Sequence, residues 1–91
     1  MIKLRIDRDN PIRQFLEKGK YLLESSVKCY VKLGDENVES DIRSLIIVPS
    51  YENKEGYIIP GLIFDITGKN DNYISILGNR EGIVKIIEFI E

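Results

Sequence analysis

The stretch Val27-Lys28-Cys29-Tyr30-Val31-Lys32-Leu33 (residues 27–33) decides the fold class, because apolar and polar side chains alternate along it. A period of two is the pattern of a half-buried strand, with one face on a core and the other toward water. Val27, Cys29 and Val31 fall on the apolar face. We therefore expect a sheet packed on one side, with Cys29 as a small apolar residue of its core.

Toward the N-terminus, the alternating stretch Ile2 to Asp7 predicts another strand. Asn10 and Pro11 then suit the cap and the first turn of a helix. The apolar residues that follow recur at the spacing of one helical face, and they are Ile12, Phe15, Leu16, Leu22 and Leu23. We expect a helix from Pro11 to about Glu24. A second interpretation ends a two-turn helix at Gly19 and starts a strand at Tyr21.

The C-terminal half predicts three more strands and a helix. The strands are Leu45–Val48, Leu62–Thr67 and Tyr73–Leu77. The run Leu45–Val48 is rich in β-branched residues, which is typical of a central strand covered on both faces. Residues 68–72 have the composition and length of a hairpin loop. Asn79 would cap the last helix, which carries Ile83, Ile86, Ile87 and Ile90 on one stripe.

These elements follow one another in the order β-α-β-β-β-β-α. Short loops between consecutive strands favour antiparallel pairing, and two amphipathic helices need a surface to cover. We therefore expect an α+β fold with a mainly antiparallel sheet of about five strands and both helices packed on it. The chain of 91 residues has room for one core, so residues 1–91 should form a single domain.

Composition excludes several classes of function. The chain has no histidine and one cysteine, which removes serine–histidine and cysteine–histidine nucleophile systems and makes a zinc site unexpected. Phosphate-binding glycine patterns are absent. A net charge of −2 with scattered lysines and arginines argues against nucleic acid, and no apolar run suits a membrane. We expect a cytoplasmic, non-enzymatic protein without a metal or other cofactor.

Two polar loops are the candidate binding residues. The first carries four carboxylates in seven positions, Asp35, Glu36, Glu39 and Asp41. Such a loop suits a basic surface on a partner protein, because complementary charges steer association. The second runs from Pro49 to Tyr57, and its candidate contacts are Tyr51, Glu52 and Tyr57. Tyrosine favours binding surfaces because it offers a large, stiff, amphipathic contact.

Two other functions stay open. In the first, the chain is a structural subunit that forms a homodimer through the apolar residues from Tyr57 to Phe64, since a small domain without disulfides is often stabilised by association. In the second, it is an enzyme or a small-ligand protein that uses Asp65 or the turn Gly78-Asn79-Arg80.

The stretch from Tyr73 to Ile83, followed by apolar residues at helical spacing, resembles the end of small immunity proteins that accompany bacterial polymorphic toxins. The resemblance covers about a fifth of the chain and implies no particular functional residue here. It implies an α+β protein that binds a partner toxin and blocks its active site without being an enzyme itself.

Overall fold

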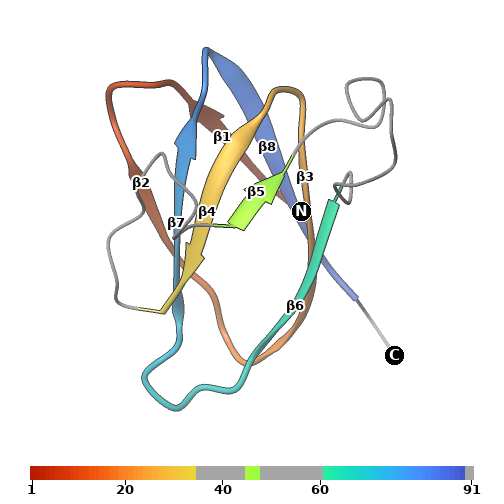
Figure 1. Cartoon of the computed structure of the whole chain (residues 1–91). Coiled ribbons are helices and arrows are strands. Elements are labelled where there is room, and N and C mark those ends of the chain that lie inside the picture. Colours follow the sequence, from red (N-terminus) through yellow and green to blue (C-terminus); the bar gives the residue numbers. More distant parts are fainter. Residues whose placement is uncertain (35–44, 48–60, 90–91) are drawn as a thin grey trace.

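A computed structural model describes residues 1–34, 45–47 and 61–89, and the secondary-structure elements in these ranges are all strands (Figure 1). In chain order they are β1 (Ile2–Ile6), β2 (Ile12–Phe15), β3 (Gly19–Ser25), β4 (Cys29–Leu33), β5 (Leu45–Ile47), β6 (Gly61–Ile66), β7 (Tyr73–Gly78) and β8 (Gly82–Glu88). The described part of the chain is therefore all-β, and the expected α+β class is wrong. In these ranges there is also no helix long and apolar enough to cross a membrane.

The strands pair as if one long hairpin had been rolled up. β1 pairs with β8, β2 with β7, β3 with β6 and β4 with β5, all antiparallel. Further pairing of β3 with β8 and of β4 with β7 closes two four-stranded sheets. Their strand orders are β1-β8-β3-β6, here called sheet A, and β2-β7-β4-β5, here called sheet B. This nested pairing over two sheets is the winding of a jelly roll.

The core lies between the two sheets and takes the inward side chains of both. The largest fully buried ones are Leu23, Ile74, Ile76, Ile86, Val31, Val84 and Cys29. Cys29 thus has the core position that its alternation predicted. Sheet A adds a stacked pair of rings, Tyr21 and Phe64, with centroids 5.7 Å apart. A core of this composition stabilises each strand mainly by removing apolar area from water.

The expected helix from Pro11 to Glu24 is wrong, because this segment forms β2 and β3. In β3 the buried Tyr21 and Leu23 alternate with the more exposed Lys20 and Leu22. Phe15 and Leu22 are apolar but point away from the core. Together with the inward apolar residues of this segment, they produced the spacing that predicted a helix. The second interpretation is right about a strand from Tyr21, which matches most of β3, and wrong about a two-turn helix before Gly19, because β2 lies there.

The expected helix after Asn79 is also wrong. Residues Gly82–Glu88 form β8, which pairs with β1 on one side and with β3 on the other. Val84 and Ile86 are buried, whereas Ile83 and Ile87 lie on the opposite face. A strand with apolar residues on both faces loses its period of two, so β-branched content is the better indicator here.

Two smaller expectations also fail. β5 ends the order of sheet B in the described residues, so it is no central strand. The loop of residues 68–72 joins β6 of sheet A to β7 of sheet B and is no hairpin. Asp71 organises this loop, because its carboxylate accepts hydrogen bonds from the backbone N–H groups of Thr67 and Gly68 at 2.8 and 2.9 Å.

Candidate interaction surface

The binding residues expected from the sequence are outside the described ranges. They are Asp35, Glu36, Glu39, Asp41, Tyr51, Glu52 and Tyr57. Along the chain, residues 35–44 connect β4 to β5 and residues 48–60 connect β5 to β6. Both predicted loops therefore belong to connections that begin or end in sheet B.

The residues considered for catalysis lie on a strand and at a turn. Asp65 is exposed on β6 and is paired in register with Lys20 of β3. Gly78 to Arg80 lead into the tight connection from β7 to β8, where the N–H of Gly78 donates to the carbonyl of Asp7 and that of Asn79 to Lys28, both at 2.9 Å. These two bonds tie the connection to two other loops.

The described ionisable groups with shifted pKa values all move away from neutrality. Burial raises the pKa of the Cys29 thiol to about 11. Burial, followed by the nearby Glu88 and Glu17, raises the pKa of the Tyr21 hydroxyl. Each of these groups keeps one protonation state near pH 7. Among the described residues, histidine, cysteine and carboxylate side chains form no group that could hold a metal ion.

Asp7 and Asp71 are the two carboxyl groups with lowered pKa values. Backbone N–H donors are the largest cause in both, from Asp9 and then Asn10 at Asp7, and from Thr67 at Asp71. The Asp7 bonds are both 2.8 Å long. Hydrogen bonds to the charged form stabilise it. Both carboxylates therefore act as caps of tight turns.

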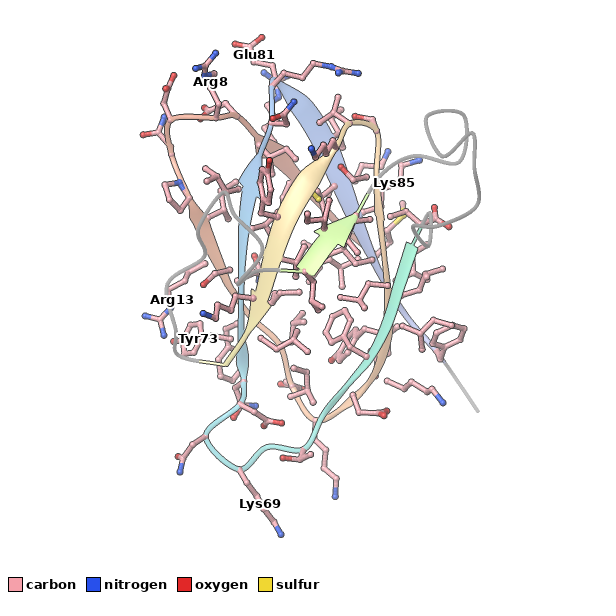
Figure 2. The ribbon with its side chains drawn as sticks, viewed as in Figure 1. Arg8, Arg13, Lys69, Tyr73, Glu81 and Lys85 are labelled. Atoms are coloured by element: carbon pink, nitrogen blue, oxygen red, sulfur yellow. The ribbon has the colours of Figure 1, made fainter. Side chains whose placement is uncertain are left out.

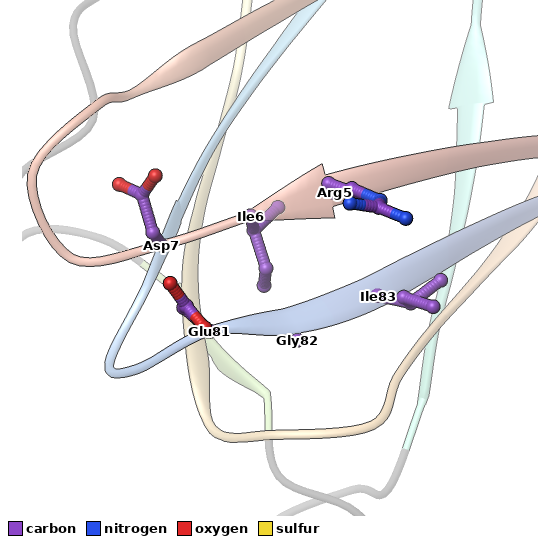
Figure 3. A pocket seen from close by; sticks show the side chains of 6 residues that line it. All are labelled: Arg5, Ile6, Asp7, Glu81, Gly82 and Ile83. Atoms are coloured by element: carbon purple, nitrogen blue, oxygen red, sulfur yellow. The ribbon is translucent and has the colours of Figure 1, made fainter.

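A hollow of about 430 Å³ lies where β1 and the start of β8 meet (Figure 3). Its lining residues are Arg5, Ile6, Asp7, Glu81, Gly82 and Ile83. In Figure 3 Asp7 and Glu81 lie on one side of Ile6, and Arg5 and Ile83 on the other. One oxygen of Asp7 is already an acceptor for two backbone N–H groups. The hollow therefore contains a structural carboxylate at its rim.

The outer face of sheet B, which points away from the core, carries an aromatic cluster at one end. Phe15 of β2 is paired in register with Tyr73 of β7, and their rings meet edge to face with centroids 5.5 Å apart. The guanidinium carbon of Arg13 lies 4.2 Å from the centre of the Tyr73 ring, within the range of a cation–π contact (Figure 2). We call Arg13, Phe15 and Tyr73 the aromatic surface.

All three residues of the aromatic surface are open to water. Phe15 is 50% exposed and Tyr73 is 37% exposed, and Arg13 is exposed as well. Rings of this size are usually removed from water in a folded protein, so their exposure at adjacent positions is informative. An isolated exposed aromatic residue would carry no such meaning.

Apart from Ser75, the other described residues of this outer face are apolar or cationic. Tyr30 and Leu77 form a small buried cluster with Ile46, separate from the main core. Lys28 places its Nζ 5.7 Å from the centre of the Tyr30 ring. The described outward positions of β2, β7, β4 and β5 include the cations Arg13 and Lys32 and no carboxylate.

The aromatic surface was not predicted from the sequence, because Phe15 was assigned to the apolar face of a helix. The available signal was its position in Ile12-Arg13-Gln14-Phe15, where an aromatic residue falls on the polar side of an alternating strand. Only the pairing of β2 with β7 brings Tyr73 next to it, and residues 16–72 lie between them in the sequence.

The comparisons with known proteins add no relative: no family model, no curated protein and no solved structure matches the chain.

Proposed function

We propose that this protein is a non-enzymatic domain that binds another protein through the aromatic surface. The observation that supports the proposal most is the arrangement of Arg13 over Tyr73, which in turn packs against Phe15. Tyrosine and arginine are the residues that contribute most binding energy in protein interfaces, and phenylalanine is enriched there. Here they form one cluster on paired strands.

The cluster is organised before any partner arrives. Strand pairing fixes the backbones of Phe15 and Tyr73, and the ring contact restricts both side chains. The contact with Tyr73 also orients the guanidinium of Arg13. A side chain that is already ordered loses less conformational freedom on binding, so more of its contact energy appears as affinity.

The chemistry of this surface points to a partner with an apolar patch. The rings of Phe15 and Tyr73 offer adjacent contacts for it. The guanidinium of Arg13 over Tyr73 adds a polar edge to the same cluster. The predicted contacts Asp35, Glu36, Glu39, Asp41, Tyr51, Glu52 and Tyr57 remain part of this proposal as a second contact region.

The narrower form of the proposal is an immunity-like inhibitor that binds a partner toxin in the cytoplasm and blocks it. It rests on the resemblance carried by Tyr73 to Ile83, a stretch that forms β7, the following turn and the start of β8. Tyr73, the first residue of that stretch, belongs to the aromatic surface. An inhibitor of this kind needs a rigid surface and no catalytic group.

The proposal is tested by purifying the tagged protein from its source with bound proteins. Phe15→Ala, Tyr73→Ala and Arg13→Ala should each reduce recovery of the partner at least tenfold, because each removes part of one cluster. Lys69→Ala is the matched control, since Lys69 is an exposed cation on the loop of residues 68–72 and its side chain points away from Arg13 and Tyr73 (Figure 2). A partner recovered equally with all four variants would contradict the proposal.

The inhibitory form has its own test. Co-expression of the partner should arrest growth when the protein carries Phe15→Ala and Tyr73→Ala together, and growth should continue with the wild-type chain. A partner without any toxicity of its own would contradict the inhibitory form and leave the binding function in place.

A further inference from the structure

The outer face of sheet A carries a row of apolar side chains that runs across three strands. Leu22 of β3 is paired in register with Ile63 of β6 on one side and with Ile87 of β8 on the other. Residues paired in this way have Cβ atoms about 4.5–5.5 Å apart, so their side chains touch. We call Leu22, Ile63 and Ile87 the apolar row.

The row faces away from the core. Its neighbours along each strand, Leu23, Phe64 and Ile86, are buried between the sheets, so the row itself points outward. Ile63 is 58% exposed, and Ile83 and Phe89, at further outward positions of the β8 segment, are 44% and 41% exposed. A solvent-facing sheet surface normally alternates to polar residues, so this apolar face indicates a contact.

Charged residues flank the row on both sides, and each side holds both signs. On one side Lys85 of β8 is paired in register with Glu24 of β3. On the other side Lys20 of β3 is paired with Asp65 of β6. Lys3 and Arg5 of β1 lie at the rim, beyond β8. A face with opposite charges at adjacent positions can match itself when a two-fold axis exchanges those positions.

We propose that the apolar row is the centre of an interface with a second copy of this chain. The two-fold axis runs parallel to the strands, between β8 and β3, and the two sheets pack face to face. Rotation about it exchanges β8 with β3, which places Ile87 against Leu22 of the second copy. The same rotation places Lys85 against Glu24 of the second copy. In a two-fold dimer the same surface patch of both copies forms the interface, so the patch must be complementary to itself. Two sheets that pack face to face with their strands roughly aligned meet this requirement.

Charge favours a second copy over an unrelated protein, because the two-fold axis sets Glu24 and Lys85 of one copy opposite Lys85 and Glu24 of the other. An unrelated protein would have to supply both signs at the same spacing. Lys3 and Arg5 of β1 add positive charge at the rim, outside these two pairs. We assign this face to the second copy and the aromatic surface of sheet B to the partner protein.

The size of the face sets the strength expected. Four strands about 4.8 Å apart and roughly six residues long at about 3.4 Å each cover roughly 400 Å² per copy. Stable complexes bury about 800 Å² per partner, so this dimer should be weaker than such complexes. Its test needs measurements at high protein concentration.

Sedimentation equilibrium of the full chain is the first test. The wild-type protein should pass from monomer to dimer as its concentration rises, and Ile63→Lys should weaken dimerisation at least tenfold. Ile63 is half exposed on β6, so a lysine fits there without entering the core, and circular dichroism verifies the fold. A wild-type chain that stays monomeric up to about 1 mM, the weak end of the usual affinity scale, would overturn the proposal.

A charge exchange between copies is the second test. Glu24→Lys and Lys85→Glu should each weaken self-association, because like charges then face each other across the interface. Mixing the two variants restores both pairs between copies, so heterodimers should form, and isotope labelling of one variant distinguishes them by mass. A two-fold axis perpendicular to the strands would instead place Glu24 of one copy opposite Lys20 of the other. Heterodimers that form between Glu24→Lys and Lys20→Glu, and not between Glu24→Lys and Lys85→Glu, would therefore overturn the assigned axis.

These tests are separate from that of the proposed function. Phe15→Ala should leave the dimer unchanged, and Ile63→Lys should leave recovery of the partner protein unchanged. A loss of both activities in either variant would contradict the assignment of the two faces to different partners.

Discussion

Gly82 is the position where one added methyl group tests the fold most sharply. It opens β8 opposite Ile6 of β1. An added Cβ there would lie 2.5 Å from Cγ2 of Val27 and 2.9 Å from the Oγ of Ser26. Val27 cannot move aside freely, because the Ser26 N–H donates to the carbonyl of Ile83 and the Ile83 N–H donates to the Ser26 Oγ, both at 2.9 Å.

Gly82→Ala should therefore lower the free energy of unfolding. Forcing a methyl group into a packed site costs about 1–3 kcal/mol. For a domain of this size each 1 kcal/mol lowers Tm by about 4–8 °C. The helix expected from the sequence predicts the opposite sign, since alanine is about 1 kcal/mol more favourable than glycine inside a helix. A loss of stability in Gly82→Ala would therefore support the strand β8, and a gain would support the helix.

Urea unfolding followed by circular dichroism measures this change. Gly19→Ala is the matched control: its nearest contact would be a carboxylate oxygen of Glu88 at 3.2 Å, the end of a flexible side chain. It should change the free energy of unfolding by less than about 1 kcal/mol. The double variant Gly82→Ala/Val27→Ala should lose less stability than the sum of the two single losses, because Val27→Ala removes the methyl groups nearest the added Cβ. A Gly82→Ala variant as stable as the wild type, or more stable, would refute the strand pairing at this site.

Two further predictions concern pH. Because the pKa of Cys29 rises from 9.0 to about 11 on folding, its contribution to stability is complete below pH 9.0 and is lost as pH rises toward about 11. The free energy of unfolding should fall by roughly 2–3 kcal/mol more in the wild type than in Cys29→Ala over this interval, as urea titrations at several pH values would measure. Asp71 has a lowered pKa, so its contribution is complete above its ordinary value of 3.8 and is lost as pH falls below it. Asp71→Asn should make acid unfolding less steep, and an unchanged acid limb in its Tm curve would contradict the proposed turn cap.

Strands with one apolar face were predictable from the sequence. β1, β4, β6 and β7 all lie within or close to their expected ranges, because hydrophobic alternation reports directly on the core. Cys29 belongs to one of them and is buried as expected. The nested pairing was not predictable, since it depends on contacts between residues far apart in the chain, such as Ile2 with Ile86.

The two helix errors share one physical cause. Phe15, Leu22, Ile83 and Ile87 are apolar residues on the outer faces of strands, and each broke the alternation that marks a strand. Phe15 belongs to the aromatic surface, and the other three lie on the outer apolar face of sheet A. Local sequence rules fail most often where a residue serves binding more than folding. The positions that misled the fold prediction are therefore among those proposed here as contacts or lie beside them.

The candidate site was only partly accessible to sequence reasoning. Composition indicated a binding domain, but the predicted contacts were chosen from polar loops. The aromatic surface needed the register of β2 with β7, which places Phe15 beside Tyr73. Pairing of this kind is a tertiary property and has no local signal.

Photo-cross-linking in the source cell asks directly whether the aromatic surface contacts a partner protein. A photoreactive phenylalanine derivative at position 15 retains an aromatic ring, and the same residue at position 69 is the control. We expect position 15 to cross-link to one protein other than this chain, position 69 to give no such product, and Arg13→Ala to abolish it. Equal cross-linking at both positions, or none at position 15, would contradict the proposal that the aromatic surface binds a partner protein.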